Sequence, residues 1–448
     1  MLSYKFVIRN SKLNITLPAV VLAVMAGVAI TGNAMMARGQ TPLGPESSGK
    51  DISAGEGAPV QIGLPELRVV PLLSVSERYD SNVFFIPGQN NEDFVTSMSP
   101  QVRVEHNGRL LTGSLMVGAT AELYVNNPEL NYLGVNGGLT LNLTNMLARI
   151  LPRATLAVTD FVQVTPQLPA FLNPEAQAAG QPDTFARGIQ PARANSIQNT
   201  VSVSGTYTFT PIVSLQASYS LSFLDFGKTF ATPSAGGFYN TTSQSASLGV
   251  QARVTRQDSL SVSYTPSLAK FGEGSGVISS FSGHNGSLAW NHTWTPSLSG
   301  SLTAGATLLD LGTGSLEVAY TGTASVTWTA RNTPVSLSYS RGVSPSYFSA
   351  GTALVSNVVT SSASYPLTAL LSISGSANYA YNESTADAVP LSFQSYGGTV
   401  GLSYALTRMF SLNASYNYNR FDQSSGGIDS TFDRQLATLT ISGAWNQR

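Results

Sequence analysis

Beyond residue 66, apolar and polar side chains alternate along most of the chain. In residues 201–210, valine, glycine, tyrosine and phenylalanine occupy one set of alternate positions, and serine and threonine occupy the other. The same alternation recurs in residues 213–223 and 410–419. Successive side chains of a β-strand point to opposite faces of a sheet, so this pattern predicts strands with one apolar face and one small, polar face.

Short turns divide the alternating stretches into hairpins. They are expected near Gly108, Pro152, Pro211, Gln257, Pro296, Asn332, Pro366 and Arg408. Counting from about Leu67, nine hairpins predict about eighteen strands, and an even number is typical of bacterial outer-membrane barrels. The irregular residues 165–195 could hide or remove one hairpin, which leaves sixteen strands as the alternative.

Alternation alone also occurs in soluble β-sandwiches. The regular hairpin spacing favours a membrane barrel, and lipid cannot satisfy the backbone groups of an open sheet edge. We therefore predict a closed, antiparallel, up-and-down transmembrane β-barrel. Longer connections, assigned to the outside because short turns belong in the periplasm, are expected around residues 81–92, 226–242, 272–280, 342–354, 382–391 and 422–431.

Aromatic residues are expected near both ends of the strands. All four tryptophans, Trp290, Trp294, Trp328 and Trp445, occupy apolar faces, and most lie beside a short turn or the C-terminus. Aromatic residues predicted near the opposite ends are Phe223, Tyr379, Tyr381, Tyr416, Tyr418 and Phe421. Two such girdles are typical of membrane barrels. The alternative is ordinary aromatic placement in a β-solenoid or sandwich.

The N-terminal residues 1–34 have the features of a signal peptide. Basic residues precede an apolar stretch, residues 15–30, and small residues precede a cleavage site after Ala34. An uncleaved anchor helix is the alternative, and Pro18 argues against it. Residues 35–65, rich in glycine, proline, serine and alanine, predict a flexible periplasmic linker, which leaves residues 66–448 for the barrel.

The composition excludes several classes of function. Only 10% of the residues are charged, against about 25% in soluble domains, and the formal net charge of -1 gives no basic surface for nucleic acid. The chain has no cysteine, which excludes disulfides and thiolate metal sites. The three histidines, His106, His284 and His292, lack metal-ligand spacing. We expect no cofactor, no metal and no enzymatic activity.

A barrel of about eighteen strands is too wide for its side chains to fill, so an aqueous lumen is expected. The inward residues are mostly small and polar, with scattered charges. Candidate pore-lining charges on the strands are Arg103, Glu105, Glu122, Arg253 and Glu317. They form no ring of a single sign, so strong ion selectivity is not expected.

The third external connection, residues 165–195, is unusually long and rich in proline and alanine. Loops of this length are usually functional or disordered. By analogy with porins whose third loop folds inward, it either constricts the pore or forms a mobile outer lid. In the first case its lining groups would be Glu175, Asp183, Arg187 and Arg193.

An early strand and loop carry a motif of the form Glu-x-Tyr-Asp-x-Asn, followed by a phenylalanine and a polar loop ending in Asp-Phe. The residues are Glu77, Tyr79, Asp80, Asn82, Phe84, Asp93 and Phe94. This segment resembles the opening of a family of β-barrel porins found with exopolysaccharide loci in Gram-negative bacteria. The resemblance covers only the first hairpin, and it implies an outer-membrane barrel that serves the export of a polysaccharide.

The C-terminus departs from a common pattern, since many such barrels end on an aromatic residue that resembles an assembly signal. Here three residues follow Trp445, and we interpret them as a short periplasmic tail. The expected partners are outer-membrane lipid, lipopolysaccharide, the barrel-assembly machinery, and a polysaccharide or an export complex.

The sequence therefore favours a pore in the outer membrane of a Gram-negative bacterium, for diffusion or export of hydrophilic solutes, with exopolysaccharide as one cargo. The alternative is a closed structural or adhesive barrel whose external loops bind a partner or matrix polymer. An enzyme at the barrel rim is disfavoured, because neither His284 nor His292 has a nucleophile at a suitable spacing.

Overall fold

The computed structural model describes residues 67–85, 91–165, 194–229, 239–272, 279–311, 316–330, 333–345, 353–385, 391–425 and 428–445. All of these residues lie in the unit Ser53–Arg448. The signal peptide and the linker, expected in residues 1–34 and 35–65, fall outside the described residues and stay predictions.

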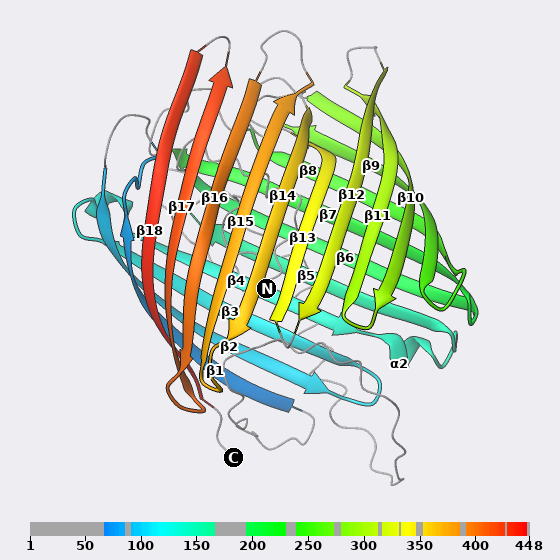
Figure 1. Cartoon of the computed structure of the whole chain (residues 1–448), viewed down its shortest axis with the longest axis horizontal. Helices are drawn as coiled ribbons and strands as arrows, with labels where there is room; N and C mark the ends of the chain where they lie inside the picture. The colour runs from blue at the N-terminus through cyan, green and yellow to red at the C-terminus, as the bar shows by residue number, and fades with distance from the viewer. Residues whose placement is uncertain are drawn as a thin grey trace, which may run out of the picture. The chain divides into compact units, whose positions relative to one another are not determined.

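Eighteen antiparallel strands form one closed barrel (Figure 1). The strands are β1 (Leu67–Asp80), β2 (Asp93–Asn107), β3 (Thr112–Tyr124), β4 (Tyr132–Asn142), β5 (Ala154–Thr165), β6 (Ala194–Thr210), β7 (Val213–Thr229), β8 (Thr241–Arg253), β9 (Asp258–Phe271), β10 (Ser279–Thr295), β11 (Leu298–Asp310), β12 (Leu316–Ala330), β13 (Thr333–Pro345), β14 (Ala353–Pro366), β15 (Leu371–Ser384), β16 (Leu391–Ala405), β17 (Phe410–Ser425) and β18 (Ile428–Ala444). Each strand pairs with its neighbours in sequence, so the predicted up-and-down barrel is confirmed.

The barrel closes where β1 pairs with β18, and we call this pairing the closure seam. Its register runs from Leu72 opposite Ala444 to Asp80 opposite Leu436. Closure leaves no sheet edge with unpaired backbone groups, as a hydrocarbon environment requires. The alternative of sixteen strands is wrong, because β5 and β6 both belong to the sheet and pair directly with each other.

Within the described residues, short turns occur at the predicted positions, and we call this end of the barrel the turn end; the turn expected near Asn332 falls outside the described residues. The β4–β5 connection differs from a simple turn, because it holds the short helix α2 (Thr144–Leu147). At the opposite end, the loop end, a 3-10 turn η2 (Pro128–Leu130) lies between β3 and β4. Among the described residues, no helix is long and apolar enough to cross a membrane.

Several strands run further toward the loop end than the sequence predicts. β7 continues to Thr229, β13 to Pro345 and β17 to Ser425, within residues that were assigned to loops. Backbone pairing does not depend on side-chain polarity, so a hairpin can continue into the polar residues beyond its apolar band. The connections that follow these three strands are correspondingly shorter than expected, whereas the first, residues 81–92, has the expected bounds.

The outer face of the barrel carries exposed apolar side chains. Val117, Leu248 and Val318 are 53%, 54% and 60% exposed. Each alternates along its strand with residues of the inner face, as the sequence pattern predicts. Large exposed apolar surfaces are rare on soluble proteins and normal where lipid is the solvent. The surface is therefore that of a membrane barrel.

The tryptophans lie toward the turn end. Trp290, Trp294 and Trp328 are 38%, 44% and 51% exposed on the outer face. Trp445 directly follows β18 and packs edge-on against Phe410, with 5.8 Å between the ring centroids. This placement agrees with the predicted girdle at the turn end, while contact of these rings with a membrane interface stays a prediction.

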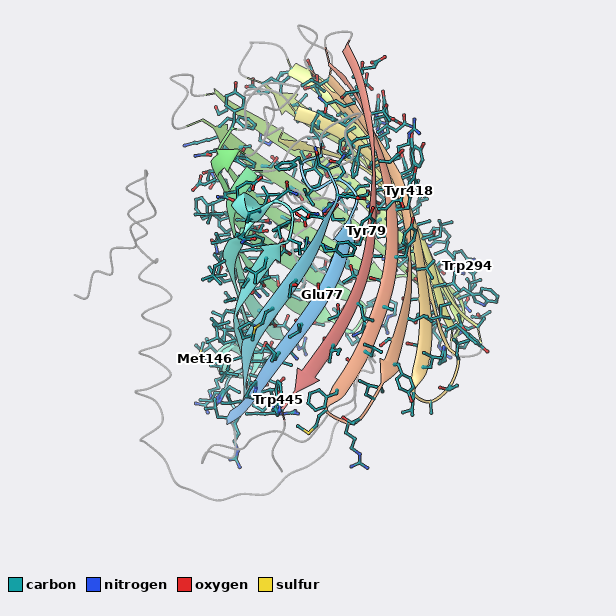
Figure 2. All side chains as sticks on the ribbon, turned by 90° about the vertical axis from the view of Figure 1, so that its left-hand side faces the viewer. Glu77, Tyr79, Met146, Trp294, Tyr418 and Trp445 are labelled. Atoms are coloured by element: carbon teal, nitrogen blue, oxygen red, sulfur yellow. The ribbon has the colours of Figure 1, made fainter. Side chains whose placement is uncertain are left out.

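Aromatic residues also mark the other end of the barrel. Figure 2 shows Trp445 near one end, and Tyr79 and Tyr418 nearer the other. The prediction is wrong for Phe421, which faces the inside of the barrel, is 5% exposed, and stacks on Phe432 at 4.9 Å. Its place in the alternation matches the inward asparagines of β17, so its ring packs inside rather than against lipid.

Candidate functional site

The inner face of the barrel is built mainly from serine, threonine, asparagine, glutamine and glycine. Hydroxyl groups on neighbouring strands pair across this face. The Oγ atoms of Ser263 and Ser287 lie 2.7 Å apart, as do those of Ser301 and Ser325. A hydroxyl has one donor and two acceptor sites, so a paired hydroxyl retains free hydrogen-bonding capacity. The wall therefore offers many weak, uncharged sites to water and polar solutes.

Charged residues of the inner face gather near the closure seam. Among residues with described side chains, those on β1, β2, β3 and β18 are Arg68, Arg78, Asp80, Asp93, Arg103, Glu105, Glu122 and Arg434. The described side chains of strands β4 to β17 add only Arg253 on β8 and Glu317 on β12. Charge is therefore concentrated on one wall, and the rest of the wall is nearly neutral.

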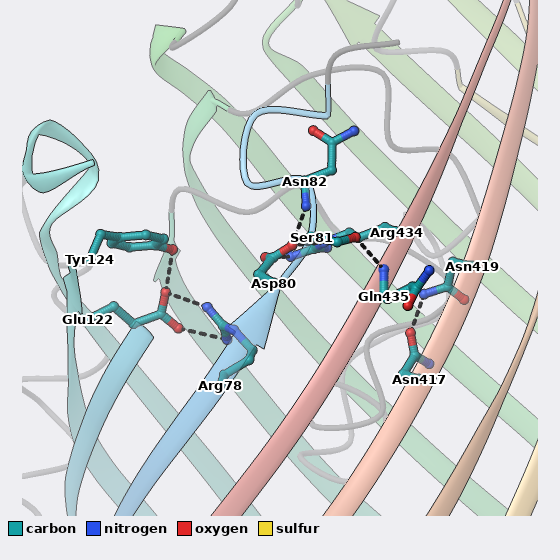
Figure 3. A network of polar contacts seen from close by, with 10 residues as sticks. All are labelled: Arg78, Asp80, Ser81, Asn82, Glu122, Tyr124, Asn417, Asn419, Arg434 and Gln435. Carbon is teal, nitrogen blue, oxygen red and sulfur yellow. Dashed lines mark hydrogen bonds and ion pairs between the residues drawn. The ribbon is translucent and has the colours of Figure 1, made fainter. Parts of the chain in front are cut away.

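One ion pair on this wall joins β1 to β3 (Figure 3). Arg78 donates from Nη1 and Nη2 to Oε1 and Oε2 of Glu122 at 3.2 and 3.0 Å. The hydroxyl of Tyr124 donates to the same carboxylate, at Oε2, over 2.7 Å. Two parallel hydrogen bonds are the strongest geometry for arginine and a carboxylate. Glu122, a predicted lining charge, is inward as expected but is 4% exposed and neutralised by Arg78.

A second ion pair crosses the closure seam. Arg434 on β18 donates from Nε and Nη2 to Oδ1 and Oδ2 of Asp80 on β1, at 3.1 and 2.6 Å. The two side chains are 6% and 1% exposed, respectively. The backbone N–H of Asn82 also donates to Oδ1 of Asp80, at 3.1 Å. Buried charges need partners of this kind, so the pair ties the first loop and the last strand to the first strand.

The second aspartate of the motif, Asp93, organises the β3–β4 connection. Its Oδ1 accepts hydrogen bonds from the backbone N–H groups of Val125 and Asn126 at 3.0 and 2.9 Å. Its Oδ2 accepts from the backbone N–H and the side-chain amide of Asn127 at 2.9 and 2.8 Å. A carboxylate that holds several N–H groups fixes a tight turn. Asp93 therefore faces inward and also holds the backbone of residues 125–127 in place.

The remaining motif residues lie around the start of the same loop. Glu77 faces outward and accepts a hydrogen bond from Oγ1 of Thr96 at 2.8 Å. Tyr79 also faces outward and packs on Phe94, with 5.4 Å between the ring centroids. Phe84 is partly buried. The motif thus divides into an outward aromatic pair and inward acids that hold the loops.

The other strand candidates lie on the inner face as predicted. Glu105 pairs with Arg68 at 3.4 Å, and their side chains are 27% and 31% exposed, respectively. Arg103, Arg253 and Glu317 make no ion pair within the described part of the chain. The candidates of the third connection, Glu175, Asp183, Arg187 and Arg193, fall outside the described residues. A role for any of these groups in lining a pore stays a prediction.

Three residues that matter most at the closure seam are absent from the sequence-based candidates: Arg78, Arg434 and Phe85. The guanidinium carbon of Arg434 lies 4.5 Å from the ring centroid of Phe85. Both arginines occupy inward positions in the alternation, which was the available signal. The register in which the first and last strands pair could not be predicted from the sequence.

The described residues contain no group of three or more acidic or histidine side chains that could hold a metal ion. His292 lies on the outer face, with Nδ1 2.6 Å from Oδ1 of Asp258 and its ring between Trp290 and Trp294. His292 therefore lies within an aromatic cluster on the outer face. For His292 and Asp258 to act as a general base and its orienting group, a nucleophile would have to lie beside them on the outer face.

Solved structures that resemble this barrel include proteins from two bacteria. The ferric enterobactin receptor PfeA of Pseudomonas aeruginosa, in a mutant form, is 9% identical over 84% of this chain and 80% of its own, with a TM-score of 0.44. OpdK of the same organism, solved with vanillate, is 12% identical over 84% and 99% of the two chains, with a TM-score of 0.43. OccAB4 of Acinetobacter baumannii is 10% identical over 86% and 99%, with a TM-score of 0.42.

Among proteins with curated descriptions, none matches the chain. A family model does match, over residues 294–442, about a third of the chain. This region runs from the end of β10 into β18 and lies apart from the motif of the first hairpin. The porin resemblance inferred from that hairpin is therefore confirmed elsewhere in the chain: residues 294–442 match the family described as "Putative beta-barrel porin 2".

Proposed function

We propose that this chain forms an aqueous pore in the outer membrane of a Gram-negative bacterium and passes hydrophilic, uncharged solutes. The observation that carries the proposal is the inner wall, which is lined with hydroxyl and amide groups and whose buried charges on one side, Asp93 apart, form ion pairs. The apolar outer face supports the membrane location. The porin-family match of residues 294–442 supports the function of a pore.

Paired charges leave the lumen without a strong field. Ion selectivity in pores depends on rings of charge of one sign. The two buried ion pairs, Arg78 with Glu122 and Asp80 with Arg434, carry no net charge. The inward charges without an ion pair in the described part of the chain lie on three different strands and include both signs: Asp93, Arg103, Arg253 and Glu317. The wall therefore suits neutral solutes better than ions.

An exopolysaccharide is one cargo that fits this wall. A sugar chain presents many hydroxyl groups, which can exchange weak hydrogen bonds with serine, threonine and asparagine side chains. Weak sites that are repeated along a pore let a chain advance, whereas one tight site would hold it. In this proposal the barrel contacts lipid and lipopolysaccharide, is inserted by the barrel-assembly machinery, and works alone or in an export complex.

A closed structural or adhesive barrel, whose external loops bind a partner or matrix polymer, is the second candidate. It is favoured by apolar side chains buried near the loop end, including Phe85, Phe271 and Leu309, which are 2%, 2% and 1% exposed. Apolar groups buried inside a barrel reduce the space that water can occupy. This candidate predicts a barrel that passes no solute.

Reconstitution of the full chain in liposomes tests the pore. We expect swelling with neutral sugars of graded size, and a difference of less than about twofold between neutral and charged solutes of equal size, because the described inner face carries no ring of charge. Planar-bilayer recordings in a salt gradient should give a reversal potential close to zero. A folded barrel that causes no swelling and no conductance would contradict the pore and support the closed barrel.

A further inference from the structure

We propose that residues 81–85 fold into the lumen and set its width at the loop end, and therefore act as the size-determining element of the pore. This inference rests on the function proposed above. It places a constriction on the first loop, whereas the sequence suggested one on the third connection, which lies outside the described residues.

The first step is the path of the backbone after β1. Ser81 still pairs with β18, since its N–H donates to the carbonyl of Gln435 at 3.1 Å and its Oγ accepts from the N–H of Gln435 at 2.9 Å. The chain then turns at Asn82, whose carbonyl accepts a hydrogen bond from the N–H of Phe85 at 3.4 Å. Phe85 has a φ of 58°, in the left-handed region that residues with a side chain rarely adopt. Such a conformation persists only where the surroundings impose it.

The second step is the contact of Val83 with one side of the wall. Val83 is fully buried and packs in a cluster with Val95, Tyr124 and Leu130. Val95 on β2 and Tyr124 on β3 are paired residues of the inner face. The loop therefore lies inside the barrel at this level, rather than above its rim.

The third step is the contact of Phe85 with the other side of the closure seam. Phe85 is 2% exposed and packs with Phe421 on β17 and Phe432 on β18, both on the inner face. The ring centroids of Phe85 and Phe432 lie 6.3 Å apart. Arg434, which holds Asp80 through two hydrogen bonds, covers the Phe85 ring.

Together these contacts run a short strap across the inside of the closure seam, from the wall of β2 and β3 to the wall of β17 and β18 (Figure 3 shows its start at Ser81 and Asn82). Volume that the strap fills is lost to solute. The charged side chains beside it are held in ion pairs or, for Asp93, by four N–H groups, so the strap acts on solute size and leaves charge selectivity unchanged.

The variant Phe85→Gly tests this directly, because glycine accepts the left-handed backbone and removes the ring. We expect single-channel conductance to rise by about twofold, since a wider lumen passes more ions, and larger neutral sugars to swell liposomes. Val83→Ser, at the other end of the strap, should shift both quantities in the same direction. Heat-modifiable mobility in electrophoresis identifies the folded barrels to be measured.

The matched control is Phe223→Ala, which removes a ring that faces outward from β7 and is 37% exposed. It should leave the conductance and the size limit unchanged. Wild-type conductance in folded Phe85→Gly and Val83→Ser, or an equal rise in Phe223→Ala, would overturn the inference while leaving the pore intact. A silent wild type that begins to conduct in Phe85→Gly would support the strap as a complete closure. Silence in every variant would instead refute the pore, and the strap with it.

Discussion

Replacing Leu248 with arginine is expected to lower the free energy of unfolding by about 2–4 kcal/mol, the cost of an arginine that faces lipid near the middle of a barrel. Leu248 lies near the centre of β8, is 54% exposed, and stands opposite Ala217 and Tyr264 on the outer face. Urea titration of the barrel folded in phospholipid vesicles measures the change.

The neighbouring residue supplies the control. Ser247 faces inward and accepts a hydrogen bond from Oγ1 of Thr265 at 3.1 Å, so Ser247→Arg places the same charge in the lumen. It should cost far less stability and should shift the reversal potential toward anion selectivity. Equal losses of stability in Leu248→Arg and Ser247→Arg would contradict both the lipid-facing exterior and the aqueous interior.

Removing one partner of the closure-seam ion pair should have an effect of similar or larger size. Arg434→Met leaves Asp80, which is 1% exposed, without its guanidinium partner. Breaking a buried pair on one side costs about 3–5 kcal/mol, because a buried charge remains uncompensated. The double variant Asp80→Asn/Arg434→Met carries no such charge and should recover much of the loss in the same urea titration.

A partly exposed arginine–carboxylate pair provides the comparison. Arg68 and Glu105 lie 3.4 Å apart on β1 and β2, and their side chains are 31% and 27% exposed. Ion pairs that water reaches contribute about 0–1 kcal/mol, so Arg68→Met should cost much less stability than Arg434→Met. Two results would contradict a role for burial in the stability effect of Arg434→Met. One is a loss of stability in Arg68→Met as large as that in Arg434→Met, and the other is a double variant Asp80→Asn/Arg434→Met as unstable as Arg434→Met alone.

The fold was largely readable from the sequence because one physical rule dominates it. A strand between lipid and water must alternate, and Val201 to Phe209 against Ser202 to Thr210 displays this rule without exception. Turns were readable for a second reason, since proline and glycine mark the places where pairing stops. Strand ends were less readable, because pairing at Thr229 and Ser425 continues where the apolar pattern has stopped.

The contacts at the candidate site were mostly not readable. Alternation assigned Glu122 to the inner face correctly, but it did not show that Arg78 neutralises it from a strand two positions away. The same rule places Phe421 on the inner face. The prediction for Phe421 was wrong because the expectation of an aromatic girdle was given more weight than the alternation. Nothing in the local pattern announces that Phe85 folds back into the barrel, because that path depends on side chains of the last two strands.

The closure seam also bears on the biosynthesis of the protein. Asp80 and Arg434 are separated by 354 positions. Asp80 is therefore synthesised among the first residues of the barrel, and its ion-pair partner among the last. Until then, β1 is an unpaired edge and Asp80 a charge without its counterion. A chain interrupted before β18 would keep both defects, whatever the quality of its remaining hairpins. Pairing of β1 with β18 thus distinguishes a complete barrel from a shortened one, and proteases would meet an exposed strand edge only in the shortened chain.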